Sequence, residues 1–145
     1  MSNNPIFIIG TMLLLFICWQ LREKIKLTIL DSVKQIQLRN YLSGSERRKL
    51  TELQKNNNLL TDHSNDQLLK DSYKCLSRAS ITRKKGKITI IIPSKNYPEL
   101  QDYIEKKLDN YLVNWLESNY PGHHWNKATL MPKSFFSWIF SIKEK

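Results

Sequence analysis

The longest apolar run of the chain lies at its start and reads IFIIGTMLLLFICWQL from Ile6 to Leu21. One glycine, one threonine and one glutamine interrupt the large apolar side chains, and no charged residue falls within the run. As a helix the run would rise roughly 24 Å, slightly less than the ~30 Å hydrocarbon core of a bilayer. We therefore predict an N-terminal membrane anchor over residues 1–21, with residues 6–21 in contact with lipid.

Two other interpretations of this run stay open. A cleaved signal peptide needs basic residues before the run and small residues at its end, and the sequence has neither. A buried core helix would suit the short run, although no neighbouring segment is apolar enough to surround it. If the run is an anchor, Arg22, Lys24 and Lys26 directly after it set the orientation. They predict a single-pass protein of the cell membrane, with its N-terminus outside and its C-terminus in the cytoplasm.

Apolar residues continue at helical spacing beyond the run. Between Ile25 and Ile36 they recur at intervals of four, four and three, which predicts a helix to about Tyr41, where a Ser-Gly-Ser sequence ends it. We assign residues 22–65 to a helical juxtamembrane stalk that ends in a polar linker, which itself covers residues 56–66. The apolar stripe could lie on the domain or on lipid, or it could be a seam for self-association in a homo-oligomer.

The clearest pattern in the remainder of the chain predicts a β-hairpin. Residues 79–83 and 87–92 read as two strands, and Gly86 between them can take the positive φ of a tight turn. We expect Pro93 to end the second strand because proline cannot donate to a ladder. A helix over residues 66–76 precedes the hairpin.

A long amphipathic helix is predicted from Pro98 to about Asn119, with one continuous apolar face that packs over the isoleucines of the hairpin. The tail at residues 133–142 reads either as a third strand or as an amphipathic segment on the membrane. We prefer the strand because a two-stranded hairpin is only marginally stable alone. The predicted fold class is therefore α+β, with one transmembrane helix, further helices and a small hairpin-and-helix domain over residues 66–145, ββαβ if the tail is a strand.

The net charge of the chain indicates which kind of partner to expect. The 145 residues carry a formal net charge of +10, and no Lys or Arg occurs before Arg22. The excess positive charge therefore lies after the apolar run and favours anionic partners such as nucleic acid, acidic lipid or an acidic protein. The two cysteines, Cys18 and Cys75, are far apart and do not form a disulfide framework.

Most of this charge is concentrated around the predicted hairpin. Six basic residues and no acidic residue occur from Arg78 to Lys95. Such a cluster could bind nucleic-acid phosphates or anionic lipid. The alternative is a solvated turn that protects an edge strand from aggregation, and the same strands carry no aromatic set for base stacking. The candidate residues for binding an anionic partner lie at the tip: Arg83, Lys84, Lys85 and Lys87.

Catalytic motifs are absent from the sequence. His123 and His124, followed by Trp125, suggest a metal or nuclease site, but no cysteine or spaced carboxylate accompanies them. No phosphate-binding loop, dinucleotide fingerprint or serine-nucleophile elbow occurs either. We therefore predict that the protein is not an enzyme, and we predict no cofactor and no metal site.

One family resemblance refines the prediction. Residues 66–142, chiefly the run SITRKKGKITI from Ser80 to Ile90 and the helix after it, resemble the membrane-proximal region of FtsK/SpoIIIE-type coupling proteins of Gram-positive conjugative elements. The ATP-binding motor of that family has no counterpart in this sequence. The resemblance implies a non-enzymatic membrane adaptor with a basic cytoplasmic domain, an accessory of DNA transfer or plasmid maintenance. Its partner would be nucleic acid or a protein of a membrane complex. The alternative is a membrane-bound immunity or protection factor against a bacteriocin or phage.

Overall fold

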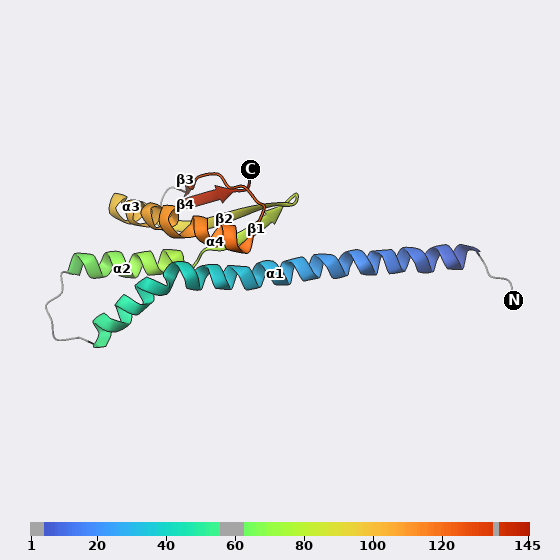
Figure 1. Ribbon diagram of the computed structural model, residues 1–145, viewed down its shortest axis with the longest axis horizontal. Helices are drawn as coiled ribbons and strands as arrows, with labels where there is room; N and C mark the ends of the chain where they lie inside the picture. Colours follow the sequence, from blue (N-terminus) through green and yellow to red (C-terminus); the bar gives the residue numbers. More distant parts are fainter. Residues whose placement is uncertain (1–4, 56–62, 135–136) are drawn as a thin grey trace. The chain divides into compact units, whose positions relative to one another are not determined.

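The computed structural model describes residues 5–55, 63–134 and 137–145 (Figure 1). It separates into two compact units, Met1–Val33 and Lys34–Lys145, each of which is described by itself. The helices are α1 (Pro5–Lys55), α2 (His63–Leu76), α3 (Pro98–Lys107), the π-helix η1 (Leu108–Leu112) and α4 (Val113–Asn119). The strands are β1 (Ser80–Lys84), β2 (Lys87–Lys95), β3 (Thr129–Ser134) and β4 (Ser137–Lys143).

The predicted membrane anchor is wrong. Residues 6–21 form the first turns of α1, and across the described parts of the chain no helix is long and apolar enough to cross a membrane. The apolar run has sixteen residues where a span needs about twenty, and extending it toward the C-terminus adds Arg22, Glu23 and Lys24. The single-pass topology predicted from it, with the N-terminus outside and the C-terminus in the cytoplasm, is therefore wrong as well.

The unit Met1–Val33 is helical where it is described, and its large apolar side chains are exposed. From Ile9 to Val33 their exposed fractions lie between 43% and 70%. The interpretation of the apolar run as a buried core helix is wrong for this reason. The helix also accommodates short polar side chains, because the hydroxyls of Thr28 and Ser32 each donate to the carbonyl oxygen four residues earlier, at 2.9 Å.

α1 continues through the Ser-Gly-Ser sequence at residues 43–45, where the sequence predicted its end. The hydroxyl of Ser43 donates to the carbonyl oxygen of Arg39 at 2.7 Å, so this turn-favouring side chain is satisfied inside the helix. Most of the predicted linker, residues 56–66, lies outside the described residues. α2 begins at His63, slightly earlier than predicted.

The predicted β-hairpin is confirmed, since β1 and β2 are antiparallel and Gly86 in their turn has a φ of 81°. β2 nevertheless continues past Pro93 to Lys95, so the predicted end of this strand is wrong. The pairing with β1 stops at Ile91, and Pro93 therefore lies where β2 has a neighbour on one side only. The missing N–H of proline is tolerated at such a position.

The strand predicted over residues 133–142 is confirmed for residues 137–142, which belong to β4, whereas Lys133 and Ser134 belong to the preceding strand β3 and Phe136 lies outside the described residues. β4 pairs with β2, and β3, which was not predicted, pairs with the other edge of β4. The order is β1-β2-β4-β3, with every pair antiparallel. The unit Lys34–Lys145 is therefore α+β with a four-stranded antiparallel sheet, one strand more than the predicted ββαβ arrangement.

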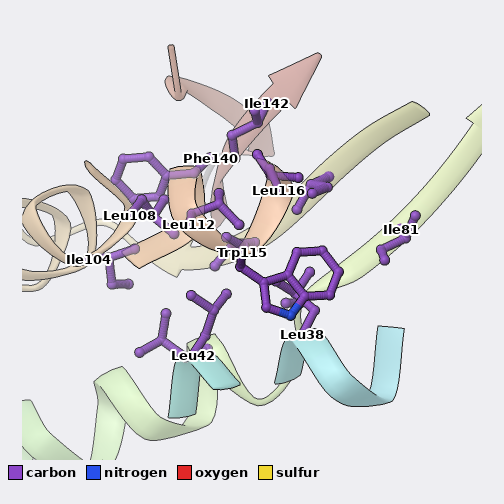
Figure 2. Close-up of a cluster of buried hydrophobic side chains, with 14 of the residues drawn as sticks. Leu38, Leu42, Ile81, Ile104, Leu108, Leu112, Trp115, Leu116, Phe140 and Ile142 are labelled. Atoms are coloured by element: carbon purple, nitrogen blue, oxygen red, sulfur yellow. The ribbon is translucent and has the colours of Figure 1, made fainter. Parts of the chain in front are cut away.

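Helices cover one face of this sheet. The helix predicted over residues 98–119 consists of α3, η1 and α4, which lie across the sheet in Figure 1. Figure 2 shows Leu112 and Leu116 of this helical stretch in one cluster with Phe140 and Ile142 of β4. Two further members of the core come from α1: Leu38 and Leu42.

A buried ion pair joins α1 to α3. The side chains of Glu46 and Lys107 are 1% and 8% exposed, and Lys107 Nζ donates to Glu46 Oε1. Tyr103 Oη donates to the same oxygen at 2.7 Å, and Lys107 also donates to Ser45 Oγ at 2.6 Å. Burial opposes ionisation of Glu46, but the hydrogen bonds from Lys107 and Tyr103 outweigh it and hold the pKa of this carboxyl below its usual 4.5.

Candidate functional site

The basic cluster predicted from the sequence lies at the turn of the β1–β2 hairpin. The last rung of the hairpin pairs Lys84 with Lys87, and Lys85 and Gly86 form a two-residue turn between them. Both turn residues have positive φ, 52° and 81°, as a type I′ turn requires. Local geometry thus brings the four predicted site residues together in what we term the basic tip: Arg83, Lys84, Lys85 and Lys87.

The residues of the basic tip lower the local stability of the hairpin. All four of its side chains are exposed. Lys84 and Lys87 are directly opposite each other, and like charges in such a pair destabilise a hairpin. Lys85 occupies a left-handed conformation that Asn, Asp or Gly adopts at lower cost. Lysine therefore occupies both the last paired positions and the first turn position, although other residues at these positions would make the hairpin more stable.

β4 adds a fifth cation beside the basic tip. Lys143 is opposite Thr89 of β2, and Thr89 is opposite Thr82 of β1. These three residues form a row across three strands on the face of the sheet opposite to core residues such as Ile90. Lys143 is exposed, so its charge adds to that of the tip. The sequence did not reveal that Lys143 lies beside the hairpin, because the β2–β4 pairing joins residues that are distant along the chain.

An acidic side chain, Glu144, also lies near the tip. It accepts the backbone N–H of Ile88 at 3.0 Å and makes a hydrogen bond of 2.6 Å with Nδ1 of His123. The bond from the Ile88 amide, then the bond to His123 and the nearby charge of Lys87, hold the pKa of this carboxyl below its usual value. Glu144 is therefore ionised at neutral pH and offsets part of the charge of Lys87.

The two adjacent histidines have different surroundings. His123 contacts Glu144 and packs against the rings of Tyr120 and Trp125, with centroids 5.8 Å and 6.3 Å away. His124 is exposed. Within residues 5–55, 63–134 and 137–145, no three His, Cys, Asp or Glu side chains are grouped to hold a metal ion. The absence of a metal, a cofactor and catalysis stays a prediction.

The chain was compared with known protein families, curated proteins and solved structures. No protein-family model, no curated protein and no solved structure matches the chain. The predicted resemblance to coupling proteins of conjugative elements therefore stays a prediction.

Proposed function

We propose that the protein is a non-enzymatic adaptor whose basic tip binds the phosphate backbone of nucleic acid. The observation that carries this proposal is the clustering of four exposed cations at one hairpin turn, where Lys84 and Lys87 share a face of the sheet with Lys143 and Arg83 lies on the other face. Lysine and arginine are the usual donors to phosphate oxygens, and phosphate contacts dominate the affinity of most DNA-binding proteins. A role in DNA transfer or plasmid maintenance follows from the family resemblance alone and stays a prediction.

The unfavourable arrangement of the tip supports this proposal. A polyanion that lies against Lys84 and Lys87 would relieve the repulsion between them, so binding would restore the stability that this repulsion costs the free hairpin. A single carboxylate could neutralise only one of the charges. A polymer with a phosphate at every step offers several charges at once.

The composition of the strands favours a duplex over single-stranded nucleic acid. Proteins that bind single strands stack bases on aromatic side chains, and neither β1 nor β2 contains an aromatic residue. The tip carries donors to phosphate but no pattern of amides for reading base edges. We therefore expect weak, sequence-independent binding to duplex DNA.

The test measures binding of the full chain to a fluorescent DNA duplex of about two helical turns, at 50 mM and at 200 mM salt. Four phosphate contacts predict a slope of log K against log salt of about −3.6, which is a roughly 100-fold loss of affinity between these concentrations. A variant with all four tip residues changed to glutamine should lose most of the binding. The matched control changes four exposed lysines elsewhere to glutamine: Lys55, Lys70, Lys74 and Lys133.

The two variants have the same net charge, so a difference between their affinities for DNA reflects the position of the tip residues and not the total charge. If both lose binding equally, the tip has no special role and the proposal is wrong. Binding that ignores salt, or binding to anionic lipid vesicles without any binding to DNA, would also contradict it.

A further inference from the structure

A polar cleft of about 260 Å³ lies between α1 and α2, within the unit Lys34–Lys145. Arg39, Gly44 and Arg47 line it from α1, and Tyr73 lines it from α2. Among the residues that the structure describes, no aspartate or glutamate lines this cleft. Two arginines therefore belong to one cleft whose walls carry no negative charge, which suits the cleft to an anion.

Arg39 is held in place by the segment that precedes β1. Its Nε donates to the carbonyl oxygen of Ala79 at 2.7 Å, and the residue is half-buried. This bond uses the Nε–H of the guanidinium and leaves the N–H groups of both Nη atoms as donors for a ligand. A group that is already fixed loses less conformational entropy when a ligand binds.

Arg47 lines the same cleft from about two turns farther along α1. It is exposed, and because side chains of an α-helix lean toward its N-terminus, Arg47 leans back over the turn that contains Gly44. Nothing lies within 4 Å of a Cβ built on Gly44, so the wall of the cleft is open at this point. The missing side chain of Gly44 therefore leaves space for a ligand beside Arg47.

The rest of the lining suits an organic group. Tyr73 supplies an aromatic ring, and Ile36, which is 57% exposed, supplies an apolar side chain. The volume of the cleft is less than twice that of a cavity of about 150 Å³ that accommodates benzene. The cleft can therefore accommodate an anionic group together with about one ring.

We propose that this cleft binds a small organic phosphate monoester, with its phosphate between Arg39 and Arg47 and its organic group against Tyr73. A phosphate monoester carries a charge of about −1.5 to −2 at neutral pH, which matches two guanidinium groups better than the single charge of a carboxylate. Arginine also binds phosphate oxygens through paired N–H···O bonds. None of the side chains of the basic tip lines this cleft, so either proposal can fail without the other.

The test compares phenyl phosphate, which has both a ring and a phosphate, with inorganic phosphate and with phenol. Calorimetric titration of the full chain measures the affinity for each probe. Phenyl phosphate should bind at least about fourfold more tightly than inorganic phosphate, the factor that corresponds to burial of one methylene group. Phenol should show no saturable binding, because it lacks the phosphate.

The glycine amides show where the probe binds. The chain has only four glycines, so their resonances are few in the spectrum of the ¹⁵N-labelled protein. Gly44 lines the cleft, whereas Gly86 lies in the turn of the basic tip. Phenyl phosphate should shift the amide resonance of Gly44 in a saturable way and leave that of Gly86 unchanged.

Two variants and one matched control test the residues of the cleft. Arg47→Gln should weaken the binding of phenyl phosphate about tenfold or more, the factor expected from one hydrogen bond to a charged group. Gly44→Leu fills the open wall without a change in charge, so it should abolish binding. Arg78→Gln removes the same charge from an exposed arginine that does not line the cleft, so the affinity should change less than about twofold. Thermal melting of each variant shows whether it is folded.

Equal shifts of the Gly44 and Gly86 resonances, or equal losses in Arg47→Gln and Arg78→Gln, would show that phenyl phosphate responds only to net charge and would overturn the proposal. The absence of saturable binding, or phenol that binds as tightly as phenyl phosphate, would overturn it as well. Equal affinities for phenyl phosphate and inorganic phosphate would overturn the assignment of Tyr73 to the organic group.

Discussion

Glu46→Leu offers the sharpest test of how the unit Lys34–Lys145 is held together. The substitution removes the carboxylate that Lys107 and Tyr103 share, and it leaves the ammonium group of Lys107 in a side chain only 8% exposed. A buried charge that loses its partner keeps its full desolvation cost. We therefore expect the free energy of unfolding to fall by about 3–5 kcal/mol.

A fall of this size is a large part of the stability of a domain, which is typically about 5–15 kcal/mol. The double variant Glu46→Leu, Lys107→Met removes both charges and replaces them with side chains of similar volume. Because the cost comes from an unpaired charge rather than from the lost attraction, we expect the double variant to recover most of the loss. Equilibrium unfolding in urea, with the far-ultraviolet circular dichroism of the full chain as the signal, measures all three proteins.

An exposed pair with similar geometry provides the control. Lys106 Nζ lies 2.7 Å from Asp102 Oδ2, and these side chains are 73% and 62% exposed. Asp102→Leu should change the free energy of unfolding by less than about 0.5 kcal/mol, because exposed pairs contribute little. If Glu46→Leu costs no more than Asp102→Leu, or if the double variant is as unstable as the single one, burial of the pair does not control stability and the reasoning is refuted.

The elements that could be predicted from the sequence are those with a local signal. The alternation around Gly86 and the positive φ that its turn needs are properties of adjacent residues, and the hairpin is present. The helical spacing after Pro98 likewise depends on neighbours along the chain. β3 contains Pro132 and exposes much of its surface, so its alternation is too weak to recognise.

The error at the N-terminus came from treating a short apolar run in isolation. Its sixteen residues are fewer than a span requires, and charged residues follow directly. The structure shows that the helix has no boundary at Leu21 and none at residues 43–45. The sequence predicted that the helix continues beyond Leu21 to about Tyr41, and the Ser-Gly-Ser sequence was mistaken for its end because these residues favour turns when no partner inside the helix satisfies them.

The candidate site was predictable only in its local part. The four residues of the basic tip are neighbours in sequence, whereas Lys143 reaches them through the pairing of β2 with β4. The Glu46–Lys107 pair is also built from distant segments. No periodicity within one element encodes which segments meet, so these features required the structure.

Two further predictions concern a backbone position and an ion pair. Gly86→Ala should destabilise the protein by about 1–2 kcal/mol, because Gly86 has a φ of 81°. Gly44→Ala should instead stabilise it by about 0.5–1 kcal/mol, because Gly44 lies in the interior of α1 and nothing lies within 4 Å of the added Cβ. Shifts of the urea midpoint in the same direction would contradict the conformational argument. Asp71, which pairs with Lys95 at 2.6 Å, predicts a pH dependence. Burial opposes ionisation of Asp71, but hydrogen bonds from Lys95 and Gln67 outweigh it and hold the pKa of Asp71 below its usual 3.8. The stabilisation is therefore present above about pH 3.8 and is lost as the pH falls through the lower pKa of the folded state. Asp71→Asn should cost about 1–2 kcal/mol at neutral pH and progressively less in acid, as measured by urea unfolding across that range. An equal cost at neutral and strongly acidic pH would show that the charge of Asp71 does not stabilise the fold.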